Sequence, residues 1–120
     1  MRTELTIAQR INLHFLVGTL PAKDIKSIRL AWQIMDKLEL SEEEKKAINY
    51  ELVPLDPEGN QLVPRWTDGV LPAKEFDFDR NETAFLRHAL ESAAMRSGLL
   101  PGPARVWLEP LINTFILEED

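Results

Sequence analysis

The stretch KEFDFDRNETAFLRHALESA, residues 74–93, changes its periodicity midway and decides the fold class. Residues 74–79 alternate charged and aromatic side chains at period two, which is typical of a strand with one face in solvent. Apolar side chains then recur every three or four residues, which predicts a helix over 82–97 with Asp79 or Asn81 as its N-cap. A strand that runs directly into a helix indicates an α+β fold.

Two amphipathic segments precede this stretch. Residues 5–17 carry apolar side chains at spacings of three and four, so we expect a helix that ends near Gly18, where glycine accommodates the left-handed conformation. Pro21 suits the first turn of a second helix over about 22–38. The heptad-like apolar stripe of this second helix predicts its buried face and consists of Ile25, Ile28, Trp32 and Met35.

The middle of the chain predicts a short helix and two strands. Ser41 and Glu44 have the spacing of a capping box, in which each side chain accepts from the other residue's amide, so we expect a helix over 42–48. Residues 50–53 and 61–63 have strand character on either side of a turn-rich segment. With the strand described above, they predict a small two- or three-stranded antiparallel sheet that packs on helices in a mainly helical domain.

The C-terminal segment, residues 104–117, is unusually apolar. Pro110 cannot donate a backbone hydrogen bond, so we expect the helix there to be interrupted or kinked. Because the apolar side chains cover more than one stripe, the segment is either wedged into the core on two sides or exposes part of itself to a partner. The residues that would form such an interface are Trp107, Leu108, Leu111, Ile112, Phe115 and Ile116.

Length and composition indicate one soluble domain over 1–120. The chain is 44% hydrophobic and 28% charged, as expected for a globular protein with a packed core. It contains no cysteine, which excludes disulfides, thiolate metal sites and cysteine nucleophiles. No apolar run resembles a signal peptide or a membrane span, so we expect a cytoplasmic protein without membrane contact.

The formal net charge of −6 limits the possible partners. Residues 51–120 hold six basic and thirteen acidic side chains, whereas binding to duplex nucleic acid depends on neutralising phosphates with Lys and Arg. A general DNA-coating role is therefore disfavoured. The basic residues Lys23, Lys26 and Arg29 of the helix at 22–38 keep weak nucleic-acid binding open as an alternative.

No arrangement of side chains predicts catalysis. Residues 77–81 begin like a calcium loop, but Glu82 stands where the loop needs glycine and His88 stands where it needs a bidentate glutamate. Neither His14 nor His88 has a second histidine at metal-ligand spacing, and the serines lack a nucleophile motif. The glycines are scattered, so no phosphate loop is encoded. We expect no enzyme activity, no cofactor and no metal.

A particular order of caps and apolar positions runs along most of the chain. It comprises Leu5-Thr6, Arg10, Leu20-Pro21, Ser41-Glu42-Glu43-Glu44, Tyr50, Trp66, Lys74-Glu75-Phe76-Asp77-Phe78 and the helix around 83–93. This order resembles that of small uncharacterised helical proteins encoded by phages and prophages, although the match weakens around 54–60 and at the proline-interrupted C-terminus. The resemblance implies a phage or bacterial cytosolic setting and carries over no catalytic or binding residue.

These observations predict a non-enzymatic protein–protein interaction module, an accessory protein of a phage or prophage that acts on a host or phage protein. Two alternatives stay open. A self-assembling structural protein would form a homo-oligomer through residues 104–117. A nucleic-acid-binding protein would use the basic face of the helix at 22–38.

Overall fold

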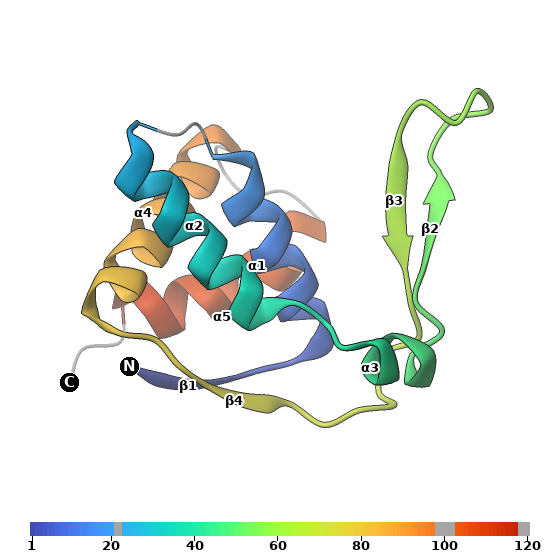
Figure 1. Cartoon of the computed structure of the whole chain (residues 1–120), viewed down its shortest axis with the longest axis horizontal. Coiled ribbons are helices and arrows are strands. Elements are labelled where there is room, and N and C mark those ends of the chain that lie inside the picture. Colours follow the sequence, from blue (N-terminus) through green and yellow to red (C-terminus); the bar gives the residue numbers. More distant parts are fainter. Residues whose placement is uncertain (21–22, 98–102, 118–120) are drawn as a thin grey trace. The chain divides into compact units, whose positions relative to one another are not determined.

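The computed structural model describes residues 1–20, 23–97 and 103–117. The chain divides into a larger unit, residues 1–39 and 74–120, and a smaller unit, residues 40–73. Both units combine helix with a two-stranded antiparallel sheet (Figure 1). The predicted α+β class with a predominance of helix is therefore confirmed, although the strands form two separate sheets.

The larger unit is a helical bundle with a two-stranded sheet along one side (Figure 1). Its core consists mainly of leucines and phenylalanines from every helix of this unit, and also includes Leu5, Phe76 and Phe78 from its extended segments. The elements of its described part are β1 Arg2–Leu5, α1 Ile7–Thr19, α2 Ile25–Leu38, β4 Lys74–Asp77, α4 Arg80–Ser97, α5 Pro103–Ile112 and the π-helical turn η1 Asn113–Leu117.

The sheet of the larger unit joins the start of the chain to the strand predicted at 74–79. β1 pairs antiparallel with β4, and Thr3 lies opposite Phe76. Phe76 and Phe78 are buried, whereas Glu75 and Asp77 are exposed, so the predicted alternation of aromatic and acidic faces is confirmed. The strand β1 was not predicted, since its only buried residue is Leu5 and its partner lies about 70 residues away along the chain.

Capping side chains set where the helices begin. Thr6 and Gln9 form a capping box at the start of α1, which places Leu5 in the strand rather than in the predicted helix. Asp24 accepts from the amide of Ser27 at 2.8 Å, so α2 begins at Ile25 instead of near residue 22. Of the two predicted caps for α4, Asp79 is the one that accepts from the Glu82 amide. Each such cap stabilises its helix by about 1 kcal/mol.

The buried face of α2 differs from the predicted stripe. Ile25 and Trp32 are 66% and 61% exposed, while Ile34 and Leu38 are buried and Met35 packs against the core. The helix carries apolar side chains on two faces, and packing against α1 and α4 selects the face of Ile34 and Leu38. Periodicity alone cannot make this choice because both faces repeat at helical spacing. The predicted position of Pro21 lies outside the described residues.

The C-terminal segment forms α5 and η1, and the helix continues through Pro110. The proline removes one backbone hydrogen bond, and the chain widens into a π-helical turn a few residues later. Leu108, Leu111 and Phe115 point into the core, where the Phe115 ring lies 6.1 Å from that of Phe78. This segment is therefore an integral part of the packing of the larger unit.

The smaller unit contains α3 Glu42–Ala47 and a hairpin of β2 Glu51–Pro54 and β3 Leu62–Arg65. Both hydrogen bonds of the predicted Ser41–Glu44 capping box are present. The predicted strands pair antiparallel with Val53 opposite Val63. Since β4 belongs to the sheet with β1, the hairpin is a sheet of two strands only.

Candidate interaction groove

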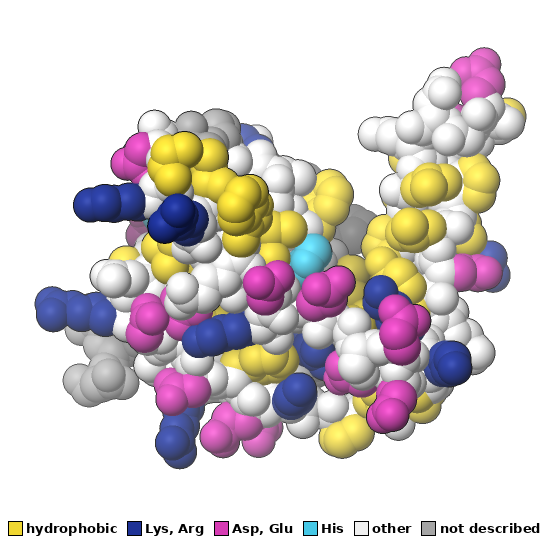
Figure 2. Space-filling model, viewed as in Figure 1, with side chains coloured by type: hydrophobic (Ala, Val, Ile, Leu, Met, Phe, Trp, Pro, Cys, Tyr) yellow, Lys and Arg dark blue, Asp and Glu magenta, His cyan; other side chains and the backbone are white. Residues whose placement is uncertain are grey.

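An open groove lies between α2 and α4 in the larger unit. Its volume is about 1480 Å³, and it is lined by side chains of α2, α4, α5 and η1. This volume exceeds the roughly 300–1,000 Å³ of pockets that enclose small molecules. Over α2, Figure 2 shows basic side chains beside exposed apolar ones. The size of the groove and its mixed lining favour a macromolecular ligand.

The floor of the groove is mostly aliphatic, with Phe85 as its one phenylalanine, and is continuous with the core. Its apolar side chains are partly exposed because they pack on the core from one side and face the groove from the other. They come from segments far apart in the sequence, so the floor exists only after the bundle has assembled. The floor residues are Leu20, Leu30, Phe85, Ala94, Ile112 and Ile116.

The rim of the groove is basic on the α2 side. Lys23, Lys26 and Arg29 line it and are exposed, and none of them has an ion pair with another residue in the ranges that the structure covers. Arg96 adds a fourth cation near the end of α4. Four cations therefore surround the groove of a chain whose formal net charge is −6.

Two carboxylates, Asp24 and Glu91, also line the groove. Asp24 is engaged as the N-cap of α2, where the hydrogen bond from the backbone amide of Ser27 holds the pKa of its carboxyl below the ordinary value. Its negative charge thus interacts with the amide end of α2. Since four cations and two carboxylates line the groove, its rim carries an excess of positive charge.

One basic rim residue, Lys26, occupies a position that does not favour the stability of α2. The amide end of a helix carries a partial positive charge, which favours acidic side chains in the first turns and disfavours cations. No acidic residue lies in the first turn of α2, where Lys26 is found, and Arg29 follows one turn later. Side chains that lower the local stability of a fold are concentrated at functional sites.

One complete face of α4 borders the groove. The lining positions from Asn81 to Met95 recur every three or four residues and include Ala84, Phe85 and His88. At a rise of about 1.5 Å per residue, this face is about 21 Å long. The groove therefore extends along about four turns of helix.

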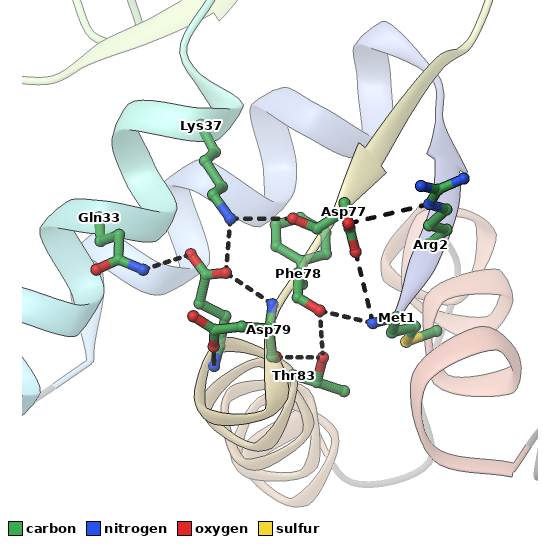
Figure 3. A network of polar contacts seen from close by, with 9 residues as sticks. Met1, Arg2, Gln33, Lys37, Asp77, Phe78, Asp79 and Thr83 are labelled. Carbon is green, nitrogen blue, oxygen red and sulfur yellow. Dashed lines mark hydrogen bonds and ion pairs between the residues drawn. The ribbon is translucent and has the colours of Figure 1, made fainter.

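The buried carboxylate of Glu82 joins α4 to α2 next to the groove. Its partners Gln33, Lys37 and Asp79 are labelled in Figure 3. Glu82 is fully buried and accepts from Lys37 Nζ at 2.6 Å, from the Asp79 amide at 2.8 Å and from Gln33 Nε2 at 2.9 Å. Burial raises the pKa of this carboxyl, but the hydrogen bonds from Lys37, Asp79 and Gln33 outweigh burial and lower the pKa. Because both carboxylate oxygens of Glu82 accept hydrogen bonds from within the protein, we assign this residue a structural role.

The sequence-predicted interface residues divide into two groups. Ile112 and Ile116 are partly exposed and line the groove. Leu108, Leu111 and Phe115 are at most 1% exposed and belong to the core. The side chain of Trp107 lies outside the described part of the chain.

The predicted basic residues and histidines are also placed by the structure. Lys23, Lys26 and Arg29 come together at the groove, and His88 lies on the α4 face that borders it. His14 is half-buried on α1 and does not line the groove. Within the ranges described, no cluster of three His, Asp or Glu side chains could hold a metal ion.

Sequence reasoning missed Leu20, Leu30, Phe85 and Ala94 as groove residues. Leu20 follows α1 as its C-cap, and the other three lie in amphipathic helices, where nothing in a periodic pattern distinguishes a residue that closes the core from one that faces a groove. Among the residues that the structure describes, no helix combines the length and the apolar character needed to cross a membrane.

No protein-family model, curated protein or solved structure matches this chain.

Proposed function

We propose that this protein is a non-enzymatic interaction module that binds a partner protein in the groove between α2 and α4. The observation that carries the proposal is the groove itself, which has an aliphatic floor, a charged rim and a length of about four helical turns. Binding sites between proteins commonly combine an apolar centre with a polar rim.

The cellular setting is proposed from the resemblance to phage and prophage proteins. It suggests an accessory protein that acts on a host or phage protein in the bacterial cytoplasm. The distribution of charge agrees with binding to a protein rather than to duplex nucleic acid, because the net charge of −6 opposes a general attraction to phosphates. The identity of the partner is left to experiment.

Self-assembly is the second candidate, and exposed apolar side chains favour it. Val106 of α5 is 77% exposed, and Phe15, Ile25 and Trp32 are each more than half exposed on α1 and α2. Such residues are common at contacts between copies of one chain. This candidate no longer depends on Leu108, Leu111 and Phe115, which the core already buries.

Photo-crosslinking in bacterial cells tests the proposal. A photoreactive phenylalanine at His88, on the groove face of α4, is expected to crosslink to a partner protein. The matched control carries the same residue at Glu75, which is exposed on β4 and does not line the groove. A product specific to position 88 supports the groove as the binding site.

Two other outcomes would count against the proposal. Identical products from positions 88 and 75 would show non-specific contact, and no product from position 88 would show an unoccupied groove. A crosslinked species with twice the 13.8 kDa mass of one chain would favour self-assembly instead.

A further inference from the structure

We propose that the occupant of the groove is an acidic amphipathic helix of the partner protein, its apolar face on the floor and its Asp and Glu side chains against the basic rim. This inference rests on the proposed function and adds the chemistry of the partner. It follows from the charge of the rim, the composition of the floor and the length of the α4 face.

The charge of the rim selects for an acidic partner. Lys23, Lys26 and Arg29 line one side of the groove and make no ion pair within the described ranges. Lys23 is attracted by the neighbouring Asp24, whereas a partner's carboxylates can approach Lys26 and Arg29 without displacing an internal acid. The three cations also lie at the amide end of α2, whose partial positive charge adds to theirs. A basic partner would meet like charges, which disfavour binding.

The floor of the groove fits the apolar face of a helix. Leu30 on one wall and Phe85 on the other are partly exposed, and Ile112 and Ile116 complete the surface from the C-terminal segment. A length of about 21 Å accommodates about 14 residues of α-helix, whose apolar side chains at i, i+3, i+4 and i+7 would contact the floor. Helix-in-groove binding is the mode that this geometry supports.

The same floor argues against single-stranded nucleic acid as the occupant. Proteins that bind single strands combine cations with several aromatic side chains on which the bases stack. Here the aromatic side chains among the described lining residues are Phe85 and His88, and the others are aliphatic, small, polar or charged. The combination of aliphatic floor and basic rim therefore favours a protein helix.

A selection from displayed peptides tests this inference. The library presents helical peptides of about 16 residues with Leu, Ile, Met or Phe on one face and Glu, Gln or Lys at the flanking positions. Selection is carried out against the full chain. We expect Glu to be enriched over Lys at the flanking positions and the selected peptides to bind more weakly as salt is raised.

A charge-reversed variant and a matched control sharpen the test. K26E/R29E is expected to weaken the best acidic peptide about tenfold and to shift the selection toward Lys at the flanking positions. The control K46E/R80E makes the same change in net charge at exposed positions that do not line the groove, and is expected to bind as the unaltered chain does. Circular dichroism and thermal unfolding establish that both variants are folded.

The remaining outcomes separate the two proposals. Selected helices without a preference for Glu, or with equal affinity for K26E/R29E, would overturn the acidic partner and leave the groove as a protein-binding site. Failure to enrich any helix would overturn the helical partner, and crosslinking from position 88 then decides whether a partner protein binds in the groove. The nucleic-acid alternative would be established by three results together. An oligothymidine binds the unaltered chain, K26E/R29E abolishes this binding, and the acidic peptides do not bind.

Discussion

Glu82 shows how a single side chain joins two helices. Its two oxygens accept hydrogen bonds from α2 and from the residue that caps α4, and Lys37 is only partly exposed on the other side of this contact. The carboxylate thus completes a capping box at α4 and holds α2 beside it. This contact joins the two helices that form the walls of the groove.

The first prediction concerns the effect of Glu82 on stability. E82Q is expected to lower the free energy of unfolding at pH 7 by about 1–3 kcal/mol, because it weakens charge-assisted hydrogen bonds to a buried acceptor. The pKa of Glu82 is lowered from 4.5, so the unfolded state takes up its proton first as the pH falls. The contribution of the carboxylate is therefore complete above about pH 4.5 and is lost as the pH falls through the folded pKa.

Urea denaturation between pH 7 and pH 3 measures this effect. The difference in stability between the unaltered chain and E82Q should shrink as the pH falls below about 4.5. E75Q is the control, because Glu75 is exposed on β4 and makes no comparable contacts. A constant difference over the whole range would show that the charge of Glu82 does not stabilise the fold.

At the scale of elements, the C-terminal segment contributes side chains both to the core and to the groove. α5 and η1 bury Leu108, Leu111 and Phe115 in the core and present Ile112 and Ile116 to the groove. The core interpretation of this segment is confirmed for Leu108, Leu111 and Phe115, whereas contact with a partner stays a prediction for Ile112 and Ile116. Packing explains the three buried residues of the segment, and Val106, Ile112 and Ile116 are apolar side chains of the segment that are partly or largely exposed.

The second prediction separates these roles by stability. F115A is expected to lower the free energy of unfolding by about 3–5 kcal/mol, because it leaves a cavity beside Phe78. V106A is expected to change it by less than about 0.5 kcal/mol, since Val106 is 77% exposed on the same segment. Equilibrium denaturation measures both, and equal effects from the two variants would contradict the placement of Phe115 in the core.

At the scale of the whole molecule, the two units differ in how much apolar surface they bury. The core cluster lies entirely in the larger unit, whereas the buried apolar residues described in the smaller unit are Leu40 and Ile48. Its sheet has two strands, and Leu52 and Leu62 on the hairpin are more than half exposed. A hairpin of this kind is marginally stable without further packing.

The third prediction follows from this difference. In hydrogen-exchange measurements, the amides of β2 and β3 are expected to open at a free energy at least about 2 kcal/mol below that of the α1 and α4 amides. The reason is that few apolar contacts oppose local opening of the smaller unit. Equal opening free energies in both units would show that the chain unfolds as one cooperative unit.

Several features of the fold were predictable because they depend on neighbouring residues. The Ser41–Glu44 capping box and the cap of Asp79 on Glu82 each join residues three positions apart. The alternation over 74–79 likewise identified the buried phenylalanines. The candidate site was predictable only in part, as basic residues on α2 and as Ile112 and Ile116 in the C-terminal segment.

Local order in this protein is thus set by its amino-acid sequence, through hydrogen bonds and periodicities that act within one or two turns. The pairing of β1 with β4, the choice between the two apolar faces of α2 and the groove itself were decided by the tertiary structure. Each of these requires segments far apart in the chain to meet. The free energy that stabilises these features comes from apolar surfaces that two segments bury against each other, so it cannot be read from either segment alone.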